Sequence, residues 1–216
     1  MRVLTWNLFH GRSVPPAGRD LLDAFAAALA GWEWDVALLQ EVPPWWPARL
    51  PADDHDVVLT SRNALLPLRR ALAQRWPDLV KSHGGGANAI LVRGGAIAAR
   101  AQVRLRCRPE RRVAHGVRVG DTWIVNLHAS AHVPARAQAD LRLAAAHALR
   151  WAGGRPLVLG GDVNLRAPRL DGFAHAGGHG VDHLFARGLA PGGLRRLERG
   201  GLSDHVPLLA TLSPTT

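Results

Sequence analysis

Short apolar segments that end in a polar residue recur along the sequence, and they restrict the fold more than any other feature. Four such segments are residues 2–8, 36–40, 123–127 and 156–160. Their length and their content of Val, Ile and Leu predict β-strands rather than helices. The polar residues at or just beyond their ends are Asn7, Glu41, His128 and Asp162. Strand ends hold side chains rigidly at the rim of a sheet, so we expect these residues to converge on one site.

Helical patterns lie between these strands. Apolar residues recur at helical spacing in residues 20–31, a second helix is predicted within 65–80 and ends at Pro77, and 135–151 forms the longest helix. Residues 96–127 read as a strand meander with a turn at Gly120-Asp121, and 181–185 and 206–212 read as the last two strands. Strands outnumber helices and several are hairpin neighbours. The pattern predicts a mixed α/β protein with one domain over residues 1–216.

The charge balance is strongly basic. The chain has 27 Lys and Arg against 17 Asp and Glu, a formal net charge of +10. A basic surface attracts phosphate groups, which favours a nucleic acid or another phosphoester as the partner. Lys81 is the only lysine among abundant Ala and Gly, which indicates a GC-rich coding sequence. That bias explains arginine over lysine, but it does not explain the excess of positive charge.

Other features exclude several classes of protein. Cys107 is the only cysteine, so neither a disulfide framework nor a thiolate zinc site can form. No apolar run approaches the roughly 18 residues that a membrane span needs. The N-terminal segment alternates like a strand and lacks the apolar core of a signal peptide. We expect a cytoplasmic monomer with no protein partner.

The polar residues at the strand ends suit phosphate-ester hydrolysis assisted by a divalent cation. Carboxylate and amide oxygens are the ligands that Mg²⁺ or Mn²⁺ prefers. Histidines can donate hydrogen bonds to a phosphate in the transition state, and a separate carboxylate can accept a proton from the attacking water. Besides the strand-end residues already named, the candidates are Asn164, Asp182, Asp204 and His205.

Six short motifs, in order, resemble those of the endonuclease/exonuclease/phosphatase superfamily. They are Thr5-Trp6-Asn7, Gln40-Glu41, Asn126-Leu127-His128, Gly161-Asp162-Val163-Asn164, Val181-Asp182-His183 and Ser203-Asp204-His205. The resemblance runs from Asn7 to His205. It implies a four-layer α/β sandwich of two packed mixed β-sheets flanked by helices. It also implies a Mg²⁺- or Mn²⁺-dependent hydrolase acting on phosphate esters.

The resemblance further implies a role for each residue. Glu41 binds the metal, with Asn7 and Asp204 as direct or water-mediated partners. Asp162 activates or orients the nucleophilic water, and Asn164 holds that water or the phosphate.

The remaining implied roles concern the phosphate. Asp182 orients His205, which contacts the scissile phosphate, and His128 contacts it from another side. Arg112 resembles the arginine that holds the phosphate end of the site, with Arg111 as a close competitor. Asn88 matches a segment seen in many members and is assigned to the substrate phosphate.

Two other patterns have competing interpretations. His175, His179 and His183 are spaced by four, which on a helix would create a zinc site, but the intervening glycines favour a surface loop. Trp45 and Trp46 follow Glu41 in a proline-rich loop and are candidates for substrate contact, although such residues more often pack in a core.

The sequence thus leaves three functional hypotheses. The first is a metal-dependent phosphodiesterase or nuclease, which the motifs and the basic charge favour. The second is a phosphatase or phosphodiesterase acting on a small molecule or a lipid headgroup. The third is a catalytically silent, basic nucleic-acid-binding module, which is disfavoured because no proposed catalytic position is replaced.

Overall fold

Two six-stranded mixed β-sheets pack face to face in the computed structural model, which describes residues 1–61, 63, 67–80, 83, 85–108 and 110–215. The first sheet has the spatial order β11 (Leu189–Arg196), β12 (Leu208–Pro214), β1 (Arg2–Asn7), β2 (Val36–Val42), β4 (Ala87–Val92) and β3 (Asp54–Leu59). The second has the order β5 (Ile97–Arg106), β6 (Arg112–Val119), β7 (Thr122–His128), β8 (Leu157–Asp162), β10 (Asp182–Arg187) and β9 (Ala174–His179).

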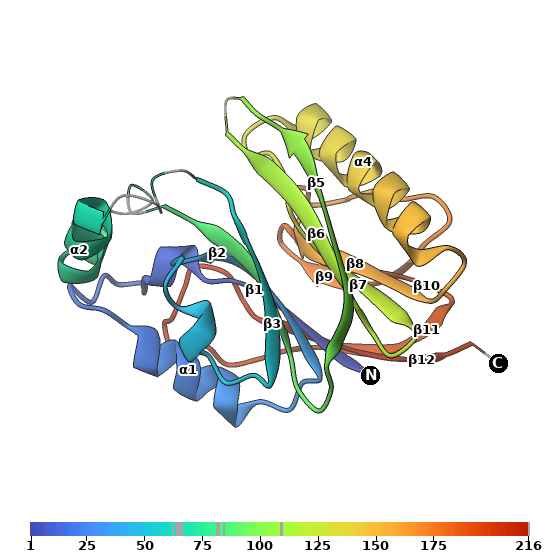
Figure 1. Cartoon of the computed structure of the whole chain (residues 1–216), viewed down its shortest axis with the longest axis horizontal. Coiled ribbons are helices and arrows are strands. Elements are labelled where there is room, and N and C mark those ends of the chain that lie inside the picture. Colours follow the sequence, from blue (N-terminus) through green and yellow to red (C-terminus); the bar gives the residue numbers. More distant parts are fainter. Residues whose placement is uncertain (62, 64–66, 81–82, 84, 109, 216) are drawn as a thin grey trace.

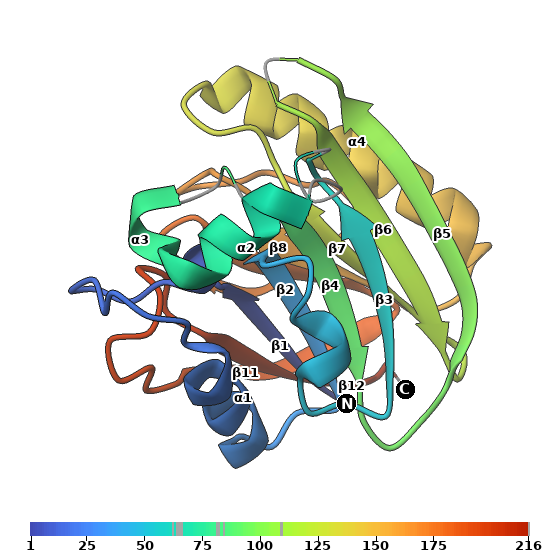
Figure 2. The same ribbon diagram turned by 60° about the vertical axis from the view of Figure 1, so that its left-hand side comes forward.

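Helices cover the outer faces of both sheets, so the molecule has four layers (Figure 1). Helix α1 (Leu22–Gly31) packs on the first sheet, and α4 (Pro134–Ala152) packs on the second. Figure 2 shows α2 (Pro67–Arg75) and α3 (Pro77–Val80) beyond the end of the first sheet. Short 3₁₀ turns occupy Phe9–Gly11 and Pro47–Arg49. The four-layer α/β sandwich that the resemblance implied is confirmed.

Apolar side chains fill the three spaces between these layers. Between the sheets, the buried residues are mostly β-branched or leucine, such as Val36, Ile124 and Leu184. Under α1, the aromatic rings of Trp6 and Phe25 have centroids 4.9 Å apart. Small alanines of α4 let that helix lie close to the second sheet. The central strands are therefore apolar on both faces, which explains their continuous apolar sequence.

One parallel pair lies in each sheet, and all other pairings are antiparallel. β1 pairs with β2 in the first sheet, and β7 pairs with β8 in the second. Because the strands of a parallel pair run the same way, their carboxyl ends meet at the same edge of the sheet. This arrangement positions the candidate site.

A buried polar network joins the two sheets beside that edge. The Gln40 amide nitrogen donates to Asn126 Oδ1 at 2.8 Å, and the Asn126 amide nitrogen donates to the carbonyls of Leu39 and Ala89. Beside this network, β7 and β8 approach each other closely at Leu127 and Gly161. Gly161 has φ +134° and no room for a Cβ, which would lie 2.0 Å from the Leu127 carbonyl oxygen.

The structure adds three strands that the sequence did not predict. They are β3, β9 and β11, and each lies at the edge of a sheet. The expectation of a surface loop for His175 and His179 was wrong, because β9 contains both residues and pairs with β10. The expectation that 181–185 and 206–212 are the last two strands was also wrong, because β11 lies between them.

The helices fall where they were expected, with small shifts at their ends. The helix predicted within 65–80 is divided at Trp76 and Pro77 into α2 and α3, and its expected start at Leu65 lies outside the described residues. Within the described part of the chain, no helix is long and apolar enough to cross a membrane.

Candidate active site

The carboxyl ends of both parallel pairs carry the candidate catalytic side chains. Asn7 ends β1 opposite Gln40 of β2, and His128 ends β7 opposite Asp162 of β8. Glu41 follows Gln40 directly. The site therefore lies across the two sheets, with one parallel pair contributing from each side.

Several residues at this edge have positive φ angles although they are not glycine. Among them are Glu41 (φ 50°), Asn164 (φ 52°) and Ser203 (φ 62°). Such conformations cost free energy and persist where the surrounding structure holds them. Ser203 is held by two hydrogen bonds, since its hydroxyl donates to the Asn7 carbonyl at 2.7 Å and accepts from the His205 backbone N–H at 3.0 Å. The loop before β12 is thereby fixed to the end of β1.

Asp162 is buried and both of its carboxylate oxygens accept hydrogen bonds. The Asn7 amide nitrogen donates to Oδ2 at 2.9 Å, and the Asn164 backbone N–H donates to Oδ1 at 3.0 Å. Burial raises the pKa of Asp162, while His205, Asn7 and Asn164 oppose the shift. The carboxyl group is thus held in one orientation and is more basic than an exposed aspartate.

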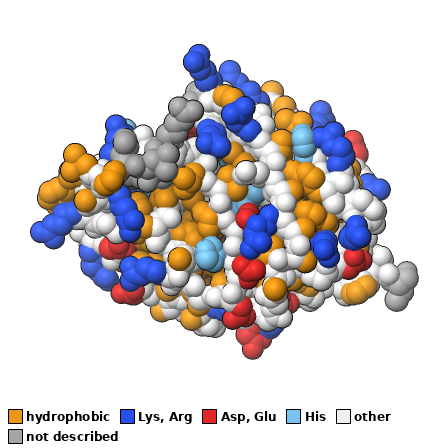
Figure 3. All heavy atoms as spheres, viewed as in Figure 1, with side chains coloured by type: hydrophobic (Ala, Val, Ile, Leu, Met, Phe, Trp, Pro, Cys, Tyr) orange, Lys and Arg blue, Asp and Glu red, His pale blue; other side chains and the backbone are white. Residues whose placement is uncertain are grey.

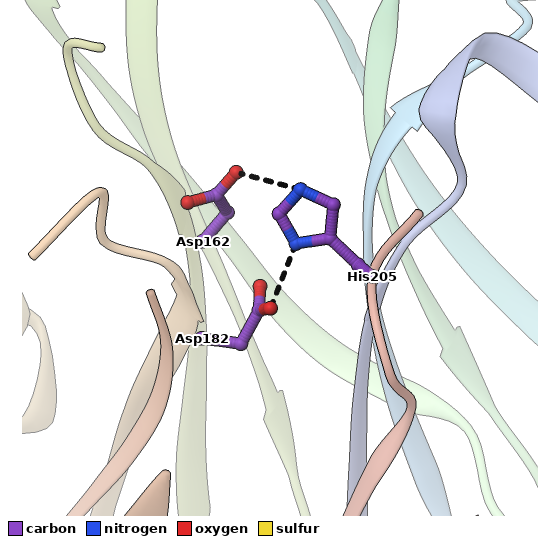
Figure 4. Close-up of side chains that lie close together, drawn as sticks. All are labelled: Asp162, Asp182 and His205. Atoms are coloured by element: carbon purple, nitrogen blue, oxygen red, sulfur yellow. Dashed lines mark hydrogen bonds and ion pairs between the residues drawn. The ribbon is translucent and has the colours of Figure 1, made fainter. Parts of the chain in front are cut away.

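His205 lies between two aspartates, as Figure 4 shows. Its Nδ1 is 2.7 Å from Asp182 Oδ2, and its Nε2 is 3.9 Å from Asp162 Oδ2. Burial lowers the pKa of His205, but the hydrogen bond and negative charge of Asp182, with Asp162 and Asp204, outweigh burial and raise that pKa to about 9. The imidazole is therefore a cation at neutral pH, with Nδ1–H donated to Asp182 and Nε2–H directed toward the cleft.

Asp182 is the orienting partner of this histidine. Burial raises the pKa of Asp182 to about 6, with the His205 hydrogen bond opposing the shift. Asp162, Asp182 and His205 lie close enough together to resemble a metal-binding cluster. We interpret them instead as a hydrogen-bonded charge network, because His205 Nδ1 is already engaged by Asp182 Oδ2 at 2.7 Å.

Glu41 faces the same cleft from the first sheet. Its Oε2 is 3.1 Å from His10 Nε2, and its Oε1 is 3.9 Å from His128 Nε2. Burial raises the pKa of Glu41, whereas His205 and an amide hydrogen bond from Asn7 lower it. The raised pKa indicates a carboxylate with too little positive charge around it.

His128 and His10 are both neutral. Burial lowers the pKa of His128 well below its ordinary value, and the nearby cation of Arg112 adds to the effect. Burial, with the charge of Arg12, lowers the pKa of His10 to about 4. His128 Nε2 lies 3.5 Å from Asp162 Oδ2, so a neutral hydrogen-bond donor and the His205 cation approach Asp162 together.

Of the two neighbouring arginines, Arg112 is the one whose charge acts on the candidate catalytic side chains. Arg112 is buried at the start of β6 and pairs with Glu110, and its charge reaches His128, His10 and Glu41. Arg111 is exposed, although both arginines line the cleft. Asn88 is buried on β4, does not line the cleft, and has no hydrogen-bond partner for its amide among the described residues.

An open cleft of about 1220 Å³ contains these groups. Its floor includes Glu41, His128, Asp162, Asn164 and His205. Its rim includes four arginines besides Arg112, namely Arg12, Arg104, Arg108 and Arg111. Carboxylate and amide oxygens thus lie beside the arginine side chains of the rim. This arrangement suits an anionic substrate together with a hard cation.

The oxygen donors of the site fit a divalent cation. Glu41 and Asp204 both line the cleft, and the negative charge of Asp204 adds to the burial that raises the pKa of Glu41, as expected for a site short of positive charge. The Asn7 amide oxygen accepts one hydrogen bond, from the Phe9 N–H at 2.9 Å, and retains a second lone pair. All three donors are hard oxygens.

His10 is the residue of this site that the sequence did not single out. It follows β1 by three positions and has φ 54°, and its contact with Glu41 depends on that turn. No local pattern marks such a residue. The only signal was its proximity to Asn7 in the sequence.

The tryptophans and the spaced histidines do not join the cleft. Trp46 packs against Phe25 in the core, and Trp45 lines a smaller cavity beside α2. His175 Nε2 hydrogen-bonds His183 Nδ1 at 3.0 Å, and His183 Nε2–H donates to the Leu165 carbonyl at 2.9 Å. With both of its nitrogens engaged, His183 acts in the packing of the β9–β10 hairpin.

Comparison with known proteins gives one family. The model of the Endonuclease/Exonuclease/phosphatase family matches residues 4–205. No curated protein sequence matches the chain.

Several solved structures share the fold at low sequence identity. An endonuclease/exonuclease/phosphatase from Bacteroides vulgatus is 16% identical, with TM-score 0.72 over 99% of this chain and 98% of that chain. A mannosyl-6-phosphatase from Bacteroides thetaiotaomicron is 14% identical, with TM-score 0.71 over 98% and 99%. TDP2 from Caenorhabditis elegans is 18% identical, with TM-score 0.65 over 98% and 74%.

Proposed function

The chain belongs to the endonuclease/exonuclease/phosphatase family, and on that basis we propose that it is a divalent-metal-dependent phosphoesterase that cleaves phosphodiesters with water. The observation that carries the proposal is the set of Glu41, Asp162 and the Asp182–His205 pair at one cleft. A simple binding module needs neither a buried basic carboxylate nor an oriented imidazolium.

We assign the metal to Glu41, with Asn7 and Asp204 as direct or water-mediated ligands. Bound there, Mg²⁺ or Mn²⁺ supplies positive charge to the phosphate oxygens. The raised pKa of Glu41 supports the assignment, because a cation beside a buried carboxylate relieves the cost of its charge.

Asp162 is the proposed acceptor of the water proton. The water oxygen attacks phosphorus as its proton passes to Asp162, and the bond from phosphorus to the leaving oxygen breaks. Asn7 and the Asn164 backbone hold the Asp162 carboxylate in place for this transfer. Its raised pKa makes it a better base than an exposed aspartate.

His205 is proposed to stabilise the transition state. Its Nε2–H donates to a phosphate oxygen, while Asp182 fixes the ring and keeps it protonated. His128, held neutral by burial, donates a second hydrogen bond, and Arg112 offsets the remaining negative charge. Asn164 is assigned to the attacking water or the phosphate. Asn88 stays a secondary candidate for the phosphate end, because its buried amide has no hydrogen-bond partner among the described residues, although it does not line the cleft.

Nucleic acid is the first candidate for the substrate. Arg104, Arg108 and Arg111 are exposed along the rim of the cleft, where they can contact phosphates on either side of the scissile one. TDP2 and the mannosyl-6-phosphatase share this fold, so the fold itself accommodates different phosphate esters. A small-molecule or lipid-headgroup phosphate is the alternative.

Hydrolysis of bis(p-nitrophenyl) phosphate, plasmid DNA, RNA and a sugar phosphate tests the proposal, in Mg²⁺, Mn²⁺ or EDTA. We expect metal-dependent turnover that falls by about 100-fold or more in His205→Ala. His55→Ala, which changes an exposed histidine outside the cleft, is the matched control. Turnover of none of these diesters with either metal would refute phosphodiester hydrolysis, and turnover of the sugar phosphate alone would select the alternative.

A further inference from the structure

Exposed apolar side chains are concentrated on α2 and α3. The described part of the chain has seven large apolar residues with high exposure; three of them lie on these two short helices and a fourth, Trp76, lies at the junction between them. The four are Leu68 (72% exposed), Leu72 (37%), Trp76 (50%) and Leu79 (79%). We refer to these four residues as the α2–α3 patch. Leaving so much apolar surface in water is unfavourable, and such surfaces commonly mark interaction sites.

The spacing of the patch residues follows a helical repeat through the junction between α2 and α3. They are separated by four, four and three positions, which is the repeat of a helix surface. Backbone hydrogen bonds continue across the junction, from Trp76 N–H to the Leu72 carbonyl and from Val80 N–H to the Trp76 carbonyl. The opposite face is directed inward, where Ala73 and Pro77 line the small cavity beside Trp45 and Trp46. The patch is therefore the outer face of a segment that is fixed on its inner side.

Arginines accompany the patch. Arg69, Arg70 and Arg75 on α2 are exposed, and the only acidic residue between Pro67 and Val80 is Asp78, which accepts a hydrogen bond from the Gly18 backbone at 2.7 Å. Figure 3 shows hydrophobic and basic side chains together at the end of the molecule where Figure 1 places α2. Apolar side chains flanked by arginines are typical of segments that lie in the interface of an anionic membrane.

Described residues that flank α2 and α3 in the sequence line the catalytic cleft. Thr60, Ser61 and Asn63 precede α2, His83 and Gly86 follow α3, and all five line the cleft. Across the cleft, Arg104, Arg108 and Arg111 lie on the β5–β6 hairpin and are exposed. A surface that received the patch would therefore meet basic side chains on both sides of the cleft entrance.

We propose that the α2–α3 patch docks this protein on an anionic lipid surface, with the cleft entrance facing the headgroups. Leu68, Trp76 and Leu79 enter the region between headgroups and acyl chains, and the arginines of α2 and of the β5–β6 hairpin contact lipid phosphates. Nucleic acid would use the arginines equally well, but it offers no apolar phase for three leucines. The apolar content of the patch thus favours a membrane surface over a nucleic acid.

Vesicle binding in EDTA tests the proposal without any turnover, so its outcome is separate from that of the proposed catalysis. The probe is vesicles of phosphatidylcholine, alone or with phosphatidylserine in roughly a three-to-one ratio. We expect the wild-type protein to sediment with the anionic vesicles, and Leu79→Asp and Leu68→Asp each to lower the partition coefficient by about tenfold. Arg69→Glu should weaken binding to the anionic vesicles. The binding that remains should depend on salt no more strongly than that of the wild-type protein.

Leu143→Asp is the matched control, because Leu143 is an exposed leucine (41%) on α4, away from the patch. Thermal melts should show all these variants folded, since each replaced side chain is exposed. Equal binding of wild type and both patch variants would overturn the proposal. A loss of vesicle binding in Leu143→Asp as large as that in the patch variants would overturn it too. Unchanged vesicle binding together with weakened binding of a single-stranded oligonucleotide would identify the patch as a nucleic-acid surface instead.

Discussion

The Nδ1 atom of His205 lies 2.7 Å from Asp182 Oδ2, and this hydrogen bond joins the loop before β12 to the first residue of β10. The loop leads into the first sheet and β10 belongs to the second, so the pair forms only when the sandwich is assembled. The pair also determines the charge of the imidazole, because Asp182 opposes the effect of burial on the pKa of His205.

Asp182→Asn should remove that effect. Burial then dominates, the pKa of His205 falls from about 9, and the ring loses its proton near neutral pH. We expect kcat to fall by about 100-fold with little change in KM, because the lost interaction belongs to the transition state. Steady-state kinetics and an NMR titration of the imidazole measure both effects. Asp121→Asn, in an exposed pair with Arg155, is the control, and an unshifted His205 titration would contradict this account.

Gly161→Ala should strongly destabilise the protein. A Cβ at this position would lie 2.0 Å from the Leu127 carbonyl oxygen, at a φ of +134° that alanine does not tolerate. We expect a loss of about 3 kcal/mol or more in the free energy of unfolding, measured by urea titration. Gly95→Ala is the control, because its added Cβ would make ordinary contacts at 3.5 Å. Similar stability of the two variants would show that the spacing between β7 and β8 does not exclude a side chain at position 161.

Gln40→Leu should destabilise the contact between the sheets. The change leaves Asn126 Oδ1 buried without its donor at 2.8 Å, which costs about 1–3 kcal/mol. A double-mutant cycle with Asn126→Leu should give a coupling energy of about 1 kcal/mol. Gln138→Leu, where the amide makes an exposed hydrogen bond to the Arg169 carbonyl, should cost much less. Strict additivity in the cycle would refute the network.

The stability of the protein should decrease below neutral pH, in part through His183. Burial, followed by the charge of His175, lowers the pKa of His183 below its ordinary value of 6.5. Its contribution is fully present above pH 6.5 and is lost as the pH falls through the folded-state pKa, because the unfolded chain binds the proton first. Urea unfolding at pH 7.5 and 5.5 should show a smaller decrease for His183→Gln than for wild type. An equal decrease in both would exclude His183, leaving His10, His128 and His147 as the other histidines of lowered pKa.

The central strands of both sheets could be predicted from the sequence, and three edge strands could not. Central strands such as β2 and β8 are buried on both faces, so their sequences are continuously apolar. In contrast, β9 contains glycines and exposed histidines, and β11 contains a proline and adjacent glycines. An edge strand is paired on one side only and tolerates such residues. Whether such a segment forms a strand depends on the strand it pairs with, and the local sequence does not specify that partner.

The residues of the site could be anticipated because polar groups at strand ends are unusual in such apolar surroundings. Glu41, His128, Asp162 and His205 do line one cleft. His10 could not be anticipated, since its contact with Glu41 depends on a local left-handed turn. The joining of Asp182 to His205 likewise depends on the packing of two sheets, which no pattern within either segment encodes.

The most direct measurement is the rate of bis(p-nitrophenyl) phosphate hydrolysis by wild type and Asp162→Asn, each with Mg²⁺ or EDTA. Asparagine keeps the shape of Asp162 but cannot accept the proton of the attacking water. The account predicts turnover that requires Mg²⁺ and falls by about 100-fold or more in the variant. Turnover in EDTA, or an Asp162→Asn variant as active as wild type, would contradict it.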